Sequence, residues 1–201
     1  MSELWAFLQI GFQHIVALDA ADHILFLLAL AAIYRGRDWR SALWVISAFT
    51  VGHSITLVLA VTNILTLPSN VVEFLIPVTI VVTGIENLVL RERAASGQHA
   101  RHRPILAGLF GLVHGAGFAG YLKSLFVAQI ALPLLGFNIG IELGQMVVLI
   151  AAAGAFWLVD AALKLLPVQR ISRNVYVARL VAVSAAIVVV ASGWAIERLP
   201  R

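Results

Sequence analysis

The sequence predicts an all-α integral membrane protein, a bundle of about six transmembrane helices with a short interfacial or broken first helix. Hydrophobic residues make up 61% of the 201 residues and charged residues only 12%, against roughly 25% charged in soluble proteins. The apolar residues form runs of about 20, the length that crosses a bilayer. Short basic connections separate these runs. We therefore expect a single bundle over residues 1–201, embedded in lipid.

The first apolar segment, residues 3–18, is interrupted by polar side chains, so we expect a short interfacial or tilted helix that breaks near residues 18–21. On one straight helix, His14 and His23 would point to opposite faces, because each residue turns about 100°. A break instead lets His14 fold back towards Asp22 and His23. The predicted spans are 20–34, 41–62, 71–90, 104–122, 137–166 and 174–196.

Single residues mark the local structure of several segments. Asp19 is a candidate N-cap of the first span, and Pro77 predicts a kink inside the span 71–90. The apolar residues 125–136, around Pro133, predict a re-entrant or interfacial connection. Two ridges of glycine are typical of close helix contacts, which can serve internal packing or a homo-oligomer. The ridge glycines are Gly108, Gly111, Gly115 and Gly120 in one span and Gly136, Gly140 and Gly144 in the next.

The basic residues predict the orientation in the membrane. Of the fourteen Lys and Arg residues, eleven lie on one side of the predicted bundle and three on the other. The positive-inside rule then places both termini outside the cytoplasm. We expect the membrane to be the inner membrane of a bacterium. The net charge of +4 is explained by this topology, so we expect no nucleic-acid partner.

Ionisable side chains lie where lipid-grade sequence is expected, at a cost of at least a few kcal/mol each, which indicates a functional interior. Cysteine is absent and methionine occurs only twice, so a soft sulfur site is excluded. Imidazole and carboxylate ligands suit Ni²⁺, Co²⁺, Zn²⁺, Mn²⁺ or Fe²⁺. The candidate metal ligands are His14, Asp22, His23, His53, Glu73, His114 and Glu142. The candidates for orienting these ligands or lining a path are Ser54, Glu86, Asn138 and Gln145.

Other interpretations stay open at this point. His53 and His114 are also compatible with neutral histidines bonded to nearby backbone, and Glu73 with a solvated interfacial residue. A zinc ion that activates water would make the protein an intramembrane hydrolase, as would Ser54 acting as a nucleophile beside His53. Neither HExxH nor GxSxG occurs in the sequence. A third alternative is haem bound between His53 and His114.

Five stretches of the chain resemble the HupE/UreJ family of small multi-pass membrane proteins, named as hydrogenase and urease accessory proteins. They are GFQHIVALDAADHILFLLAL at 11–30, AFTVGHSITLVLA at 48–60, NVVEFLIPVTI at 70–80, GLFGLVHGAGFAGYLKSL at 108–125 and LPLLGFNIGIELGQ at 132–145. The resemblance implies a permease-like protein of six to seven helices that handles nickel or a related divalent ion. The motif positions are His14, Asp22, His23, His53, Glu73, His114, Asn138 and Glu142.

Overall fold

The computed structural model describes residues 3–17, 20–35, 38–95, 101–125, 130–165 and 175–200. In these ranges the protein is all-helical, as the sequence predicts. Two short helices come first, α1 (Glu3–Val16) and α2 (Ala21–Ile33). The longer helices are α3 (Trp39–Val61), α4 (Ser69–Ala95), α5 (Arg103–Leu125), α6 (Ala131–Lys164) and α8 (Val175–Glu197).

Four of the described helices are long and apolar enough to cross a membrane. These candidate spans are Trp39–Val61, Ser69–Glu92, Ala131–Lys164 and Val175–Glu197. Helices α1 and α2 form a pair bent by 69°, which is a fifth candidate if the pair is one broken span. The predicted broken first helix is thus confirmed. The protein is a multi-pass membrane protein with four or five candidate spans in its described part, where the sequence predicts about six; α5 is not among them.

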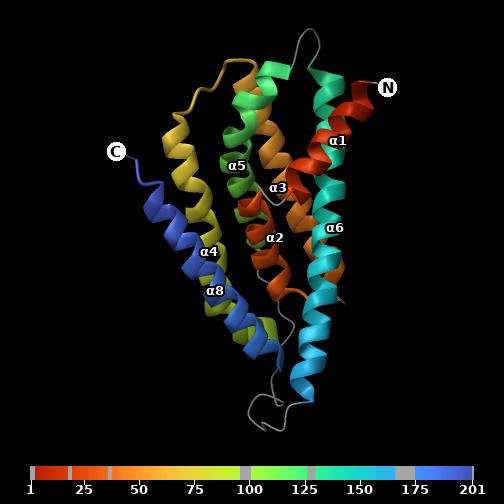
Figure 1. Cartoon of the computed structure of the whole chain (residues 1–201), viewed down its shortest axis with the longest axis vertical. Helices are drawn as coiled ribbons and strands as arrows, with labels where there is room; N and C mark the ends of the chain where they lie inside the picture. The colour runs from red at the N-terminus through yellow and green to blue at the C-terminus, as the bar shows by residue number, and fades with distance from the viewer. Residues whose placement is uncertain are drawn as a thin grey trace.

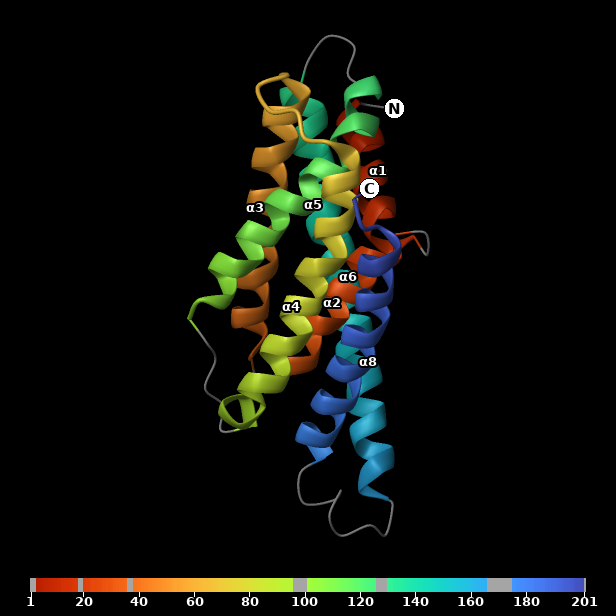
Figure 2. The same ribbon diagram turned by 90° about the vertical axis from the view of Figure 1, so that its left-hand side faces the viewer.

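Three pairs of helices run side by side, with α2 among them (Figures 1 and 2). Helix α3 packs along α5, α1 along α6, and α4 along α8. Helix α2 contacts α4, α6 and α8. Both termini lie in the upper half of the molecule as drawn in Figure 1.

Glycines allow two of these pairs to approach closely. A methyl group at Gly11 or Gly140 would meet a backbone carbonyl across the contact between α1 and α6, and one at Gly111 or Gly115 would meet α3 backbone. Gly136 and Gly144 also face α1. Both predicted ridges therefore mediate contacts within the chain, except at Gly120, which has open space around it. These contacts give no support to a homo-oligomer.

The start of α6 differs from the prediction. The sequence predicts a re-entrant or interfacial connection over 125–136, whereas α6 already begins at Ala131. Pro133 lies in the first turn of this helix, where backbone N–H groups have no intrahelical acceptor and a proline is tolerated. Residues 126–129 lie outside the described residues.

Two other local predictions concern helix starts and kinks. The proposed N-cap, Asp19, lies outside the described residues. The residue at the cap position of α2 is Ala20, which makes no side-chain cap hydrogen bond. Helix α4 continues through Pro77 from Ser69 to Ala95.

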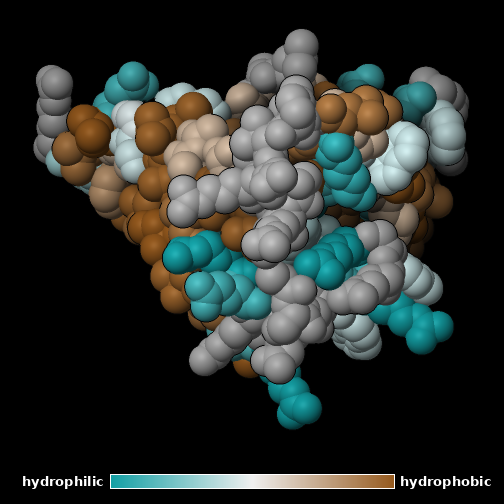
Figure 3. All heavy atoms as spheres, turned by 90° about the horizontal axis from the view of Figure 1, so that it is seen from below, coloured by the Kyte–Doolittle hydropathy of each residue, from teal (hydrophilic) through white to brown (hydrophobic). Residues whose placement is uncertain are grey.

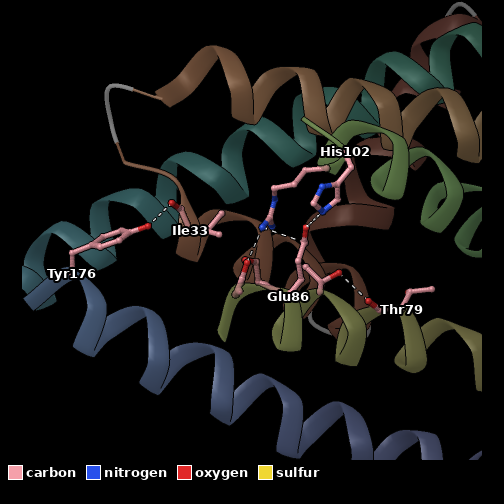
Figure 4. Close-up of polar contacts among 9 residues, drawn as sticks. Ile33, Thr79, Glu86, His102 and Tyr176 are labelled. Atoms are coloured by element: carbon pink, nitrogen blue, oxygen red, sulfur yellow. Dashed lines mark hydrogen bonds and ion pairs between the residues drawn. The ribbon is translucent and has the colours of Figure 1, made fainter. Parts of the chain in front are cut away.

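Side chains from α4 and α8 hold the C-terminal end of α2. Carbonyl groups in the last turn of a helix lack intrahelical donors, so outside donors stabilise this end. Tyr176 OH donates to Ile33 O at 2.6 Å (Figure 4). Arg179 Nη1 donates to Ala32 O at 3.3 Å, and Asn87 Nδ2 donates to Ala29 O, just before the last turn, at 2.7 Å. The short helix α2 is therefore fixed at the end opposite to its junction with α1.

Polar and basic side chains gather at the end of the molecule opposite the termini. Figure 3 looks onto this end and shows hydrophilic side chains near its centre and hydrophobic ones at its flanks. The helix ends on this side carry Arg40 in α3, Arg91 in α4, Arg103 in α5 and Lys164 in α6. One end of the bundle is thus strongly basic.

Candidate metal site

Three histidines from three helices meet beside the bend between α1 and α2. His14 lies in the last turn of α1, His23 in the first turn of α2, and His53 on α3. One ligand nitrogen of each ring lies within 4.8 Å of the other two. The ring centroids are 4.6 Å apart for His14 and His23 and 6.1 Å apart for His14 and His53. We call these three residues the histidine triad.

The helix break and the glycines of α5 make this arrangement possible. The 69° bend turns the end of α1 back over the start of α2, which brings His14 and His23 together. On the other side, Gly111 and Gly115 of α5 let the backbone around His53 come close, because any larger side chain would meet it. The triad therefore connects α1 and α2 to the paired helices α3 and α5.

The triad holds buried nitrogens that have no hydrogen-bond partner among the described residues. They are Nε2 of His14, Nε2 of His23 and both ring nitrogens of His53. A buried polar atom without a partner costs about 1–3 kcal/mol. Imidazole nitrogens that converge in this way fit a bound Ni²⁺, Co²⁺ or Zn²⁺ ion. The triad can therefore hold a metal ion of the kind that the sequence predicts.

Asp22 fixes the orientation of His23. Its Oδ1 accepts a hydrogen bond from the backbone N–H of His23 at 2.8 Å and one from Nδ1 of the ring at 3.0 Å. Because an ionised carboxylate only accepts, the ring proton lies on Nδ1 and the lone pair lies on Nε2. Carboxylates commonly orient metal-binding histidines in this way. In this geometry Asp22 supports a ligand, whereas the sequence predicts it as a direct ligand.

His114 lies next to the triad but is not part of it. Its ring centroid is 5.2 Å from that of His23. Its Nε2 lies 3.1 Å from Oγ1 of Thr79, and its Nδ1 is buried without a partner among the described residues. His114 therefore provides a fourth imidazole directly beside the triad.

Aromatic rings enclose the histidines. The ring of Phe118 is 3.8 Å from that of His14, and Phe137 packs against His14 and His53 at 5.8 and 6.2 Å. Phe49 packs against both His53 and His114, at 6.1 and 5.2 Å. These apolar walls strengthen electrostatic interactions inside the site. They also pack His53 and His114 against a phenyl ring, an arrangement that does not favour haem between them.

A cavity of about 710 Å³ leads to this region and is lined by His14, Asp22, His23 and His114. Glu73 lines the same cavity and also a neighbouring one of about 260 Å³. Since Glu73 is exposed and lies in the second turn of α4, it places a carboxylate between the surface and the histidines. The cavity is therefore accessible from the end of the bundle that carries the termini.

The polar residues of α6 lie elsewhere. Glu142, Asn138 and Ser54 line a separate groove of about 560 Å³ between α3 and α6. Gln145 is buried, and its Oε1 accepts a hydrogen bond from Oγ1 of Thr50 at 3.1 Å. None of these residues lines the histidine cavity. Glu142 is thus a predicted ligand that the described structure does not bring to the triad.

The geometry also bears on the hydrolase alternative. Oγ of Ser54 donates a hydrogen bond to the backbone carbonyl of Thr50 at 2.6 Å. Both nitrogens of the neighbouring His53 have no hydrogen-bond partner among the described residues. The nucleophile and base that this alternative requires are therefore not paired.

Glu86 belongs to a different polar group, near the basic end. Its carboxylate pairs with Arg103 Nη1 at 3.2 Å and with His102 Nε2 at 2.7 Å (Figure 4). Asn87 Oδ1 also accepts a hydrogen bond from Arg103 at 3.1 Å. Glu86 therefore neutralises a buried arginine in this structure.

Three residues of the site have no role in the sequence prediction. Thr79 contacts His114, Phe118 covers His14, and Arg198 lines the cavity beside them. A buried hydroxyl at mid-helix is a weak signal, because most such groups bond their own backbone. Phe118 and Arg198 carry no local pattern that separates them from ordinary membrane residues.

A known protein family matches almost the whole chain. Residues 1–198 match the family described as HupE / UreJ protein. The chain belongs to the HupE/UreJ family. The sequence resemblance to HupE/UreJ proteins is thereby confirmed, together with the membrane character of the protein. Comparisons with curated proteins and with solved structures give no match.

Proposed function

We propose that this HupE/UreJ protein binds a divalent transition metal ion, such as Ni²⁺, Co²⁺ or Zn²⁺, and carries it across the membrane. The observation that supports this most is the convergence of buried imidazole nitrogens from His14, His23 and His53 that lack hydrogen-bond partners among the described residues. The metal ion is the cargo. It would satisfy these nitrogens, and nothing else among the described side chains does.

The other residues support distinct parts of this function. Glu73 offers an exposed carboxylate that attracts cations to the cavity. Asp22 keeps the lone pair of His23 on Nε2. His114 provides the next imidazole beyond the triad. Together they support capture of the ion at the surface followed by binding at the buried histidines.

The orientation supports uptake from outside the cytoplasm. Basic residues gather at the end of the bundle opposite the termini, as at Arg40, Arg91 and Lys164. Under the positive-inside rule this end faces the cytoplasm, so both termini and the histidine cavity face the extracytoplasmic side of a bacterial inner membrane. A reporter fused to each terminus tests this orientation, and a cytoplasmic terminus would contradict it.

Metal binding is tested with the full chain purified in detergent. We expect about one Co²⁺ or Ni²⁺ ion per chain in a titration followed by absorption, and elemental analysis checks the stoichiometry. Replacing His14, His23 or His53 by Ala should each remove most of the binding. His102→Ala is the matched control, since His102 is a histidine that contacts Glu86 far from the triad. A wild-type protein that gains no stoichiometric metal would refute the proposal.

Transport requires a second measurement. Proteoliposomes loaded with a metal-sensitive dye should show faster entry of Co²⁺ with the wild-type protein than with His53→Ala. If the protein binds metal tightly but no flux is seen, the metal-binding part stands and the carrier part fails.

A further inference from the structure

The hydroxyl group of Thr79 decides how His114 presents its ring nitrogens. Thr79 lies on α4, about two turns before Glu86, and its side chain is buried (Figure 4). Its Oγ1 is 2.7 Å from the carbonyl oxygen of Ile76 and 3.1 Å from Nε2 of His114. A hydroxyl carries one proton. Only one of the two contacts can therefore be a bond that Thr79 donates.

The proton lies on the contact with Ile76. Two oxygens 2.7 Å apart are at the distance of an O–H···O hydrogen bond, and a carbonyl oxygen has no proton to give. Thr79 is therefore the donor to Ile76 and can only accept from His114. The ring nitrogen that faces it, Nε2, must carry the ring proton.

This assignment leaves a lone pair on the other nitrogen. A neutral imidazole has one N–H and one acceptor nitrogen, so Nδ1 of His114 is the acceptor. That atom is buried and has no partner among the described residues. The ring lies beside His23, at a centroid separation of 5.2 Å, and it lines the histidine cavity.

We propose that Thr79 is a positioning residue that holds His114 as the Nε2–H tautomer, so that Nδ1 can receive the metal ion from the histidine triad. The metal part of this proposal rests on the proposed function. Thr79 does for His114 what Asp22 does for His23: each accepts the ring N–H and directs the free lone pair inward. A carboxylate makes its histidine more basic than a hydroxyl does, so His23 is the stronger ligand and His114 the weaker next one.

The tautomer is measured without metal. The ¹⁵N NMR spectrum of the histidine-labelled, metal-free full chain in detergent distinguishes a protonated Nε2 from a protonated Nδ1, and the His114 signals are those missing from His114→Gln. We expect wild type and Thr79→Ser to show only the Nε2–H form. Thr79→Val keeps the size of the side chain but removes the acceptor, and should give a mixture of both tautomers. A wild-type ring protonated on Nδ1, or a Thr79→Val ring that keeps the pure Nε2–H form, would overturn the proposal.

The same variants are then compared for Co²⁺ entry into dye-loaded proteoliposomes, and their Co²⁺ affinity is measured in detergent. Thr79→Val should weaken the site at His114 roughly 10–100-fold, as expected for removing a group that orients a ligand. Co²⁺ entry should therefore slow, and Thr79→Ser should restore it, while the affinity of the histidine triad stays that of wild type. Thr83→Val is the matched control, because Thr83 is a buried threonine one turn along α4 whose Oγ1 donates only to the Thr79 carbonyl, at 2.9 Å. Equal rates of Co²⁺ entry with Thr79→Val and wild type overturn the metal role of His114. A wild type with the expected tautomer but without Co²⁺ binding overturns the proposed function, while the hold of Thr79 on the ring stands.

Discussion

Removing the carboxylate of Asp22 should weaken metal binding much more than it weakens the fold. In the structure, Oδ1 of Asp22 accepts two hydrogen bonds, one from the backbone N–H of His23 at 2.8 Å and one from its Nδ1 at 3.0 Å. Asp22→Ala removes both hydrogen bonds. The ring of His23 is then free to turn and to place its proton on Nε2, the nitrogen that faces the triad. In that tautomer Nε2 of His23 has no lone pair to offer a metal ion.

The two effects have different sizes. Loss of a group that orients a metal-binding histidine costs roughly 10–100-fold in affinity, which corresponds to about 1.4–2.7 kcal/mol of binding free energy. Loss of an acceptor for a first-turn N–H costs about 1 kcal/mol of folding free energy. Asp22→Asn keeps an oxygen acceptor without the charge, so its affinity should lie between those of wild type and Asp22→Ala.

Affinity is measured by Co²⁺ titration and stability by thermal unfolding of the same preparations in detergent. Asp38→Ala is the control, because Asp38 also accepts a backbone N–H, that of Arg35 at 3.0 Å, at the start of α3. The control should lose stability to a similar extent while keeping its affinity for Co²⁺. If Asp22→Ala binds Co²⁺ as tightly as wild type, the role given to Asp22 is wrong.

Three further perturbations test the packing, the basic end and the ligand chemistry. Gly115→Ala should lower the free energy of unfolding by about 1–3 kcal/mol and weaken Co²⁺ binding, because the added methyl would meet the His53 carbonyl. Gly120 has open space around it, so Gly120→Ala should change neither quantity in the same assays. Glu86→Ala leaves Arg103, which is 2% exposed, without its carboxylate and should cost about 3–5 kcal/mol in chemical unfolding, with Glu86→Ala and Arg103→Met together recovering much of the loss. Co²⁺ affinity should fall on acidification, since protons compete with the metal for imidazole nitrogens; an affinity that stays constant until the protein unfolds would exclude histidine ligands.

The first part of the site could be predicted because each step follows from local sequence. Ionisable residues are costly in apolar segments, and His14 and His23 can meet only if the helix between them breaks. The structure shows that break, with α1 ending at Val16 and α2 beginning at Ala21. The position of His53 beside them depends instead on how α3 packs, which the sequence leaves open.

The structure places Glu142, a predicted metal ligand, away from the triad. It lies two residues from both Gly140 and Gly144, hence about 200° around the helix from each. Those glycines face α1, so Glu142 has to face away from the helix that carries His14. The spacing therefore indicates the direction in which Glu142 faces, but only once the glycines are known to pack against α1 and not against a second chain.

The ion pair between Arg103 and Glu86 could not be predicted for a different reason. Arg103 lies in the connection between the predicted spans 71–90 and 104–122, where a solvated side chain is the ordinary expectation. Its pairing with Glu86 depends on the register between α4 and α5. No periodicity within one helix contains that information.

The tethering of α2 limits how the metal site can open. Hydrogen bonds from Asn87, Arg179 and Tyr176 anchor the C-terminal end of this helix, while its first turn follows the junction with α1 and makes no side-chain cap bond. When one end of a rigid helix is held in place, the opposite end undergoes the largest displacement. Any rocking of α2 about its anchor therefore displaces His23, in the first turn, farther than the residues near the anchor. A motion that leaves the basic end intact is thus enough to separate His23 from the other two histidines.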